Sequence, residues 1–224
     1  MRAIAVAALL ALGARFTSQS KSVIQPDAAK FSKTLNGHTE VVTYRGRKAV
    51  KLVPTPETAG RDQDMLAILD APELADGSID VAVAGEPRHG MPPDSRGFIG
   101  IAFRTGASGE WSEVFYLRPT NGRADDQVRR NHSVQYVSHP DFTWSRLRSE
   151  SPGVYESYVD LQPGVWTNMR ILVSGHTARL YVNGAAQPTL VVNDLKHGGG
   201  GGRIALWAHV ETDAYFGTMT IERH

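Results

Sequence analysis

The chain contains no cysteine, which excludes disulfide bonds, thiolate metal sites and cysteine nucleophiles together. Charge of one sign is lacking too: 24 basic residues face 23 acidic ones, and the formal net charge is +1. No overall field therefore draws nucleic acid or an anionic membrane, and we expect neither as a partner of the mature protein. Helical periodicity over ten or more residues is absent beyond the first 14 residues, so the fold must be built from strands.

The N-terminus has the layout of a secretory signal peptide. It reads MRAIAVAALLALGA: one arginine, an apolar run too short to span a bilayer, and small residues before a polar stretch. Cleavage after Gly13 or after Ala14 would satisfy the small-residue requirement of the cleavage site. We therefore assign residues 1–14 to a signal peptide and 15–224 to a single mature domain. An alanine-rich leader on a cysteine-free chain indicates a bacterial protein that is secreted or periplasmic.

The mature region reads as a succession of short strands joined by turns that carry glycine or asparagine. One early hairpin is HTEVVTYRGRKAVKLVP, and the strands return at short intervals after Trp166. A chain of 224 residues with 41% hydrophobic content can bury one full core. Roughly a dozen strands without helices predict an all-β domain, either a sandwich or a barrel.

Two stretches, 97–104 and 111–119, can be read one face at a time. In GFIGIAFR every second residue is large and apolar, and WSEVFYLRP continues this alternation after a turn. The same alternation in these and later strands predicts a core of Ile99, Ile101, Phe103, Phe115, Leu117, Ile171, Val173, Leu180, Val182, Ile204 and Leu206. We then expect Arg104, Tyr116 and Arg118 to share the open face, beside small residues that let a polar ligand approach.

The segment that follows these strands is rich in arginine, amide and aromatic side chains, and we expect residues 130–158 to roof the open face. Arginine and amide groups pair with sugar hydroxyls, and an aromatic ring packs on the C–H face of a sugar. Carbohydrate is therefore the expected ligand. The side chains expected to bind it are Arg104, Tyr116, Arg118, Arg130, Gln135, Tyr136 and Trp144. The alternative is a long cross-over loop that stabilises itself with its own aromatics and salt bridges.

Between Ile79 and His224 the pattern resembles the concanavalin A-like, or laminin G-like, jelly roll, and particularly the bacterial 3-keto-disaccharide hydrolase type domains. A hairpin common in that superfamily is matched by Trp166, Arg170, Val173, Gly175, Ala178, Tyr181, Val182 and Asn183. The resemblance implies an antiparallel jelly-roll β-sandwich that holds a carbohydrate on its concave sheet. The E-x-D-x-x-E strand of one glucanase branch is absent, so no catalytic pair is carried over.

Three side chains are candidates for moving protons in a glycoside hydrolase-like enzyme. Strand alternation places Glu113 on the apolar face, where loss of water would raise its pKa, although an irregular strand start would leave it in solvent. Glu156 lies in the segment expected to return over the sheet. His132 could act as a base or hydroxyl donor, or be an ordinary surface histidine.

The eight histidines show no spacing typical of a transition-metal site, and we expect no cofactor. Members of the resembled superfamily often hold a structural calcium, to which Asp213 could contribute here. Two hypotheses remain: a secreted carbohydrate-active enzyme that hydrolyses a glycosidic bond, or a non-catalytic glycan-binding or structural sandwich. They differ in whether two ionisable side chains converge on the cleft beside the arginines.

Overall fold

The computed structural model describes residues 20–224, so the expected signal peptide lies outside the described residues. Within this range no helix is long and apolar enough to cross a membrane. The longest helix there has seven residues, which agrees with the prediction of an all-β domain.

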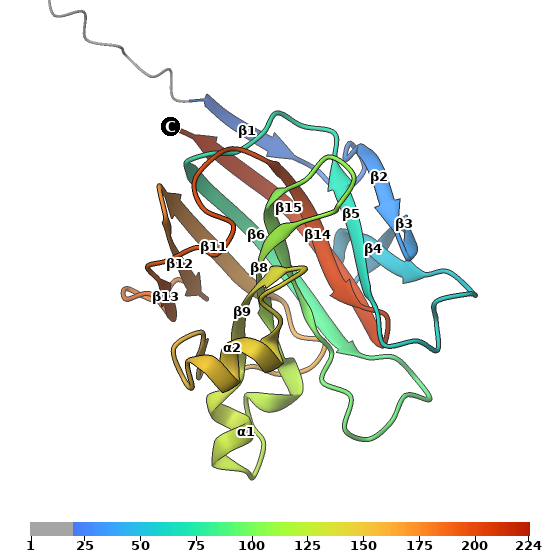
Figure 1. The fold of residues 1–224 in the computed structure, drawn as a ribbon. Helices are drawn as coiled ribbons and strands as arrows, with labels where there is room; N and C mark the ends of the chain where they lie inside the picture. The colour runs from blue at the N-terminus through green and yellow to red at the C-terminus, as the bar shows by residue number, and fades with distance from the viewer. Residues whose placement is uncertain (1–19) are drawn as a thin grey trace, which may run out of the picture.

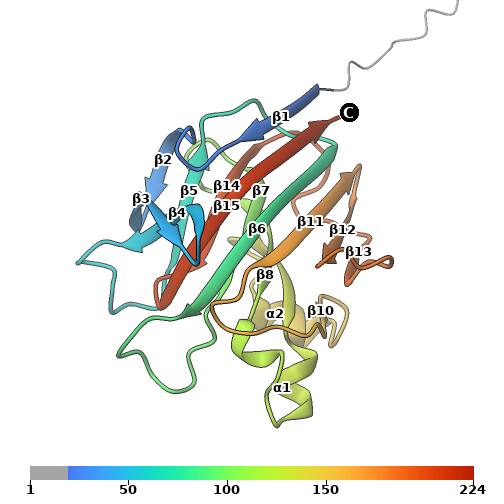
Figure 2. The same cartoon turned by 180° about the vertical axis from the view of Figure 1, so that it is seen from behind.

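Two antiparallel sheets make up the described part of the chain (Figures 1 and 2). Sheet A has the order β13-β12-β11-β6-β15-β4-β3, and β1 pairs with the C-terminal half of β15. Its strands are β1 (Ser20–Ile24), β3 (Gly37–Tyr44), β4 (Arg47–Pro54), β6 (Gly77–Pro87), β11 (Thr167–Ser174), β12 (Thr177–Val182), β13 (Leu190–Val192) and β15 (Thr212–Arg223).

Sheet B has the order β10-β9-β8-β7-β14-β5-β2. Its strands are β2 (Phe31–Leu35), β5 (Asp64–Leu69), β7 (Ile99–Thr105), β8 (Ser112–Leu117), β9 (Val134–His139), β10 (Glu156–Ser157) and β14 (Arg203–His209). A 3-10 turn, η1 (Pro119–Asn121), and two short helices, α1 (Gln127–Asn131) and α2 (Trp144–Glu150), follow β8 and β9. Figure 1 shows both helices at one end of the sandwich.

The core lies between the two sheets, and it contains the residues that strand alternation predicted. All eleven predicted core side chains are at most 3% exposed. The register places Leu206 opposite Ile101, and Ile101 opposite Phe115. The side chains of these paired residues therefore lie on the same, inner face of sheet B. The predicted set of core residues is confirmed, and the pairing shows that these side chains of sheet B share one face.

Arg104 is the exception to this alternation, and the expectation that it shares a face with Tyr116 and Arg118 is wrong. Two residues of β7, Phe103 and Arg104, oppose the single residue Ile204 of β14, which is a β-bulge. Arg104 adopts a φ of 47°, and its guanidinium donates to the main-chain oxygens of two loops, which leaves it 3% exposed. It ties loops together at the end of sheet B opposite to Arg118.

Candidate functional site

A single row of side chains crosses the outer face of sheet B. Paired residues of antiparallel strands lie on the same face, so the register can be followed from strand to strand. Across β10, β9, β8, β7, β14 and β5 the row consists of Glu156, Gln135, Tyr116, Gly100, Trp207 and Leu66. It therefore runs from a charged end through an aromatic centre to an apolar end.

The centre of the row has an aromatic floor that depends on Gly100. A Cβ atom at this position would lie 2.1 Å from the main-chain oxygen of Phe115, so only glycine lets β7 and β8 approach this closely. The rings of Tyr116 and Trp207 lie on either side, with centroids 4.7 Å apart, and Phe98 lies 5.5 Å from Tyr116. These three rings, tilted by 30° and 50° against one another, form an aromatic cluster of the kind that a sugar ring can contact.

Arg118 organises the charged end of the row. Its guanidinium donates to Tyr116 Oη at 2.9 Å, Gln135 Oε1 at 3.0 Å and Glu156 Oε1 at 3.2 Å, and also to the main-chain oxygen of His132 at 3.0 Å. The structure thus brings together five of the predicted site residues. Arg118 is only 4% exposed. The expectation that residues 130–158 roof this face is wrong in part, because residues 134–139 and 156–157 form β9 and β10 and extend sheet B itself.

Glu156 is held by two guanidiniums. Arg148 donates to both of its carboxylate oxygens, Arg118 pairs with it, and His132 Nε2 lies 3.4 Å from Oε2. Burial by itself would raise the pKa of Glu156, but the hydrogen bonds and charges of Arg148 and Arg118 outweigh it and lower the pKa. Glu156 is therefore ionised at neutral pH, and the geometry does not favour the predicted role in donating a proton.

The pKa of His132 is lowered, whereas a proton donor at neutral pH needs a raised pKa. Burial lowers its pKa, and the nearby guanidiniums of Arg148, Arg118 and Arg96 lower it further against the attraction of Glu156. The imidazole is therefore neutral at pH 7, where it can accept or donate one hydrogen bond at the edge of the site.

Glu113 and Tyr136 lie on the other side of sheet B. Alternation correctly predicted that Glu113 faces the apolar side, but that side is the interior of the sandwich and not the open face. Glu113 is fully buried, and it accepts hydrogen bonds from Tyr136 Oη at 2.5 Å and the main-chain nitrogen of His197 at 2.7 Å. A catalytic Glu113 and a sugar-binding Tyr136 are both inconsistent with this placement.

The remaining predicted binding residues differ in solvent exposure and in their contacts. Trp144, the first residue of α2, is 48% exposed, and the guanidinium of Arg148 lies 4.9 Å from its ring centroid. Gln135 is fully buried and uses its amide nitrogen to bind main-chain oxygens. Arg130 donates to Tyr158 Oη at 3.1 Å, and it does not line the cavities described next.

Two adjoining cavities lie over this face, with volumes of about 580 and 340 Å³. They share Asp62, Phe98, Trp144 and His209, and we call them together the sheet B cleft. Arg118 lines the larger cavity, and Tyr116 and Trp207 line the smaller one.

The smaller cavity contains an acidic and histidine-rich wall that sequence reasoning missed. Asp64 Oδ2 lies 3.4 Å from His139 Nε2, and Asp62 Oδ1 lies 3.0 Å from His209 Nε2. Burial raises the pKa of Asp64, although the two histidines oppose the shift. The buried indole nitrogen of Trp207 lies beside them and also opposes the shift. The one sequence signal was the D-Q-D triplet ahead of the strand that begins at Asp64.

No protein-family model and no curated protein matches the sequence. Solved structures do match. The carbohydrate-binding module CBM66 from Bacillus subtilis superposes with a TM-score of 0.56 at 12% identity, over 83% of this chain and 91% of that chain. The metal-free exoplasmic/lumenal domain of VIP36 superposes with a TM-score of 0.57 at 12% identity, over 90% of each chain. The fold is the concanavalin A-like jelly roll. At these identities the likeness shows the fold alone, and it confirms the predicted fold class.

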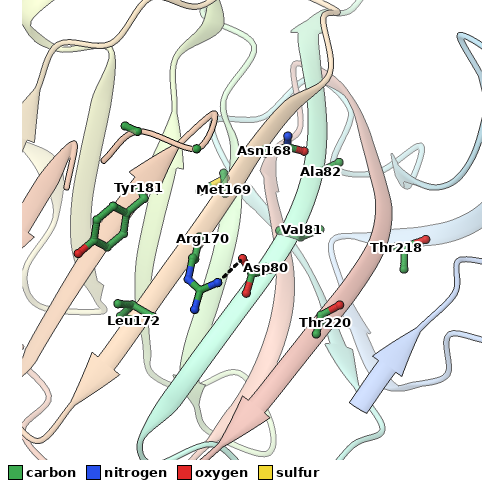
Figure 3. A pocket seen from close by; sticks show the side chains of 12 residues that line it. Asp80, Val81, Ala82, Asn168, Met169, Arg170, Leu172, Tyr181, Thr218 and Thr220 are labelled. Carbon is green, nitrogen blue, oxygen red and sulfur yellow. Dashed lines mark hydrogen bonds and ion pairs between the residues drawn. The ribbon is translucent and has the colours of Figure 1, made fainter. Parts of the chain in front are cut away.

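The jelly roll has a further cavity on the outer face of sheet A, with a volume of about 650 Å³ (Figure 3). Arg170 Nη1 and Asp80 Oδ1 lie 3.4 Å apart on its floor, and Tyr181 stands at one side. It is larger than either part of the sheet B cleft. We nevertheless place the candidate site in the sheet B cleft, because aromatic rings, guanidiniums and shifted carboxyl groups gather there.

A calcium ion does not fit the residue suggested for it in this jelly roll. Asp213 Oδ1 lies 2.8 Å from Lys51 Nζ, so an ammonium group occupies the place where a cation would have to bind. Within residues 20–224, no group of three or more histidine, aspartate and glutamate side chains is arranged to hold a metal ion.

Proposed function

We propose that this protein binds a carbohydrate in the sheet B cleft. The observation that carries the proposal is the exposed indole of Trp144 at an open cleft whose floor is the three rings of Phe98, Tyr116 and Trp207. A sugar presents C–H faces that pack on aromatic rings and hydroxyls that need paired donors and acceptors. The guanidinium of Arg148 supplies donors beside this floor.

Proteins with the same fold support the ligand class. CBM66 is by its title a carbohydrate-binding module, and the VIP36 domain has been solved with calcium and Man3GlcNAc bound. The expected signal peptide supports the same function, because a secreted or periplasmic bacterial protein would meet polysaccharides outside the cytoplasm. The cleft residues of this chain carry the rest of the argument.

Replacing Trp144 with alanine tests the location of the ligand. We expect the affinity for the best oligosaccharide in a glycan array to fall about tenfold, which corresponds to about 1.4 kcal/mol for one lost aromatic contact. Tyr181→Ala is the matched control, because Tyr181 lines the cavity on sheet A. Loss of binding in Tyr181→Ala with full binding in Trp144→Ala would place the sugar on sheet A. Absence of binding to every glycan would refute the proposal itself.

Glycoside hydrolysis is the second candidate, and Asp64 is the observation that favours it. Hydrolysis needs two carboxyl groups about 5–10 Å apart. Asp64 and Glu156 are separated by five strand spacings of about 4.8 Å, or about 24 Å, which is too far. Asp62 and Asp64 are two residues apart in the chain, and both line the smaller cavity.

In this second candidate, the raised pKa of Asp64 suits a general acid, and the exposed Asp62 would act as the base. Asp64→Asn should then abolish release of reducing sugar while leaving binding in place. The substrates should include 3-keto disaccharides, because the sequence resembles hydrolases of that type. Turnover that survives in Asp64→Asn would eliminate this assignment, and turnover by neither protein would leave a binding protein.

A further inference from the structure

Arg96 and Asn121 line the larger cavity, and the guanidinium of Arg129, which does not line it, meets that of Arg96 at one neutral oxygen of Asn121. Arg96 Nη1 donates to Asn121 Oδ1 at 3.2 Å, and Arg129 Nε donates to the same oxygen at 3.0 Å. Asn121 is fully buried and is fixed by its own donation to the main-chain oxygen of His132. Like charges are thus held side by side by a neutral acceptor, an arrangement that costs free energy unless an anion joins it.

No carboxylate of residues 20–224 accepts a hydrogen bond from either guanidinium. The other acceptors are the main-chain oxygen of Asp94 for Arg96 and the hydroxyl of Thr120 for Arg129. Among the described residues, Arg96 Nη2 and Arg129 Nη1 donate to no protein atom. The pKa of Arg96 is lowered, first by burial and then by repulsion from Arg129 and Arg118, which exceeds the attraction of Asp94.

The nearest ion-paired carboxylate does not cancel this charge. Glu156 carries one negative charge and is shared between Arg118 and Arg148, so that group keeps a net charge of +1 before Arg96 and Arg129 are added. The other carboxylates of the cavity belong to Asp62, Asp94 and Glu211. Asp62 pairs with His209, and Glu211 Oε2 accepts a hydrogen bond from Ser95 Oγ at 2.6 Å. Counted with Arg129 and Glu156, five arginines face four carboxylates in and beside the cavity, an excess of one positive charge.

We infer that the carbohydrate bound in the sheet B cleft carries an anionic group, a carboxylate or a sulfate, which lies against Arg96 and Arg129. This inference rests on the proposed carbohydrate-binding function and specifies its ligand class. The planar fork of an arginine matches a carboxylate or sulfate with two parallel hydrogen bonds. The aromatic floor contacts the sugar ring, and the arginines select its charge.

Affinity electrophoresis of the full chain through gels that contain defined polysaccharides tests the inference. The acidic polymers are polygalacturonate and alginate, with carboxylates, and dextran sulfate, with sulfates. The uncharged control polymers are fully methyl-esterified polygalacturonate and dextran. We expect retention by a carboxylated or a sulfated polymer, loss of retention when its charge is esterified or absent, and weaker retention at 0.5 M salt. Comparing the carboxylated polymers with dextran sulfate shows whether the anionic group is a carboxylate or a sulfate.

Arg96→Gln and Arg129→Gln should each weaken binding to the acidic polymer roughly tenfold or more, because each removes a charge-assisted hydrogen bond. Arg179→Gln is the matched control, since Arg179 is exposed on β12 of the other sheet. Without ligand, Arg96→Gln should melt no lower than the parent protein, because it relieves repulsion. If that variant unfolds, Arg129→Gln decides the question by the same binding assay.

Equal retention by neutral and acidic polymers, unchanged in Arg96→Gln and Arg129→Gln, would overturn the anionic ligand and leave the carbohydrate function standing. Acidic retention that Arg179→Gln removes, and the two cleft variants keep, would assign the charge preference to another surface and also overturn it. Retention by no polymer would refute the carbohydrate function together with the inference.

Discussion

Replacing Arg118 with methionine perturbs the centre of the charged network while keeping a side chain of similar length. The change removes four hydrogen bonds and leaves the carboxylate of Glu156, which is 3% exposed, with Arg148 as its remaining guanidinium partner. Removing one partner of a buried ion pair typically costs 3–5 kcal/mol. We expect about 3 kcal/mol here, because Arg148 still compensates part of the charge.

The loss should be visible in both thermal and urea unfolding at pH 7. For a domain of this size, about 3 kcal/mol corresponds to a fall in Tm of about 6–12 °C. The pH dependence identifies the cause. The folded state lowers the pKa of Glu156 below 4.5, so its ion pairs stabilise the protein above that pH and are lost as the pH falls through the folded value. The deficit of the Arg118→Met variant should therefore shrink below about pH 4.

Adding Glu156→Gln to Arg118→Met gives a second measurement. The loss of stability caused by Glu156→Gln at pH 7 should be smaller in the Arg118→Met background than in the parent protein, because the ion pair between Arg118 and Glu156 is already gone. A single Arg118→Met variant within about 0.5 kcal/mol of the parent protein would refute the reasoning, since surface changes fall in that range. Equal losses from Glu156→Gln in the two backgrounds would show that Arg118 does not act through Glu156.

Two further predictions concern the sheet beneath the cleft. Gly100→Ala should destabilise the protein by about 3 kcal/mol in urea, because its Cβ would meet the main chain of Phe115, whereas Gly60→Ala, with open space around its Cβ, should be nearly neutral. Tyr136→Phe should cost about 1–3 kcal/mol, since it removes a donor from the buried Glu113, and should leave glycan affinity unchanged. Lost affinity with unchanged stability in Tyr136→Phe would contradict its placement inside the sandwich.

Strand alternation predicted the core because each strand of the sandwich has one face that cannot meet water. A shift of one residue would bury polar side chains along the whole strand, so the pattern is strongly constrained. The same rule failed at Arg104, where a bulge adds one residue to β7. Nothing within GFIGIAFR marks that bulge, because its cause lies in the pairing with Ile204, a hundred positions away.

The site was predictable only where its residues follow one another along adjacent strands. Local alternation placed Tyr116 and Arg118 on one face, whereas Gln135 was expected in the segment above them and lies on the neighbouring strand β9. Asp64 meets Trp207 across the pairing of β5 with β14, which no local pattern reveals. Alternation also treated Arg118 as a solvated side chain, whereas the following segment buries it.

Glu113 and Glu156 show why the face of a strand has to be assigned before a carboxylate is given a role. Both are buried glutamates of sheet B, on β8 and β10, with a strand between them. Glu113 points inward, where a tyrosine hydroxyl and a main-chain nitrogen bind it and no ligand can reach. Glu156 points outward, where it fixes two guanidiniums beside the cleft. The face of the sheet to which the side chain points, more than residue type or burial, therefore separates a structural carboxylate from one that shapes a binding site.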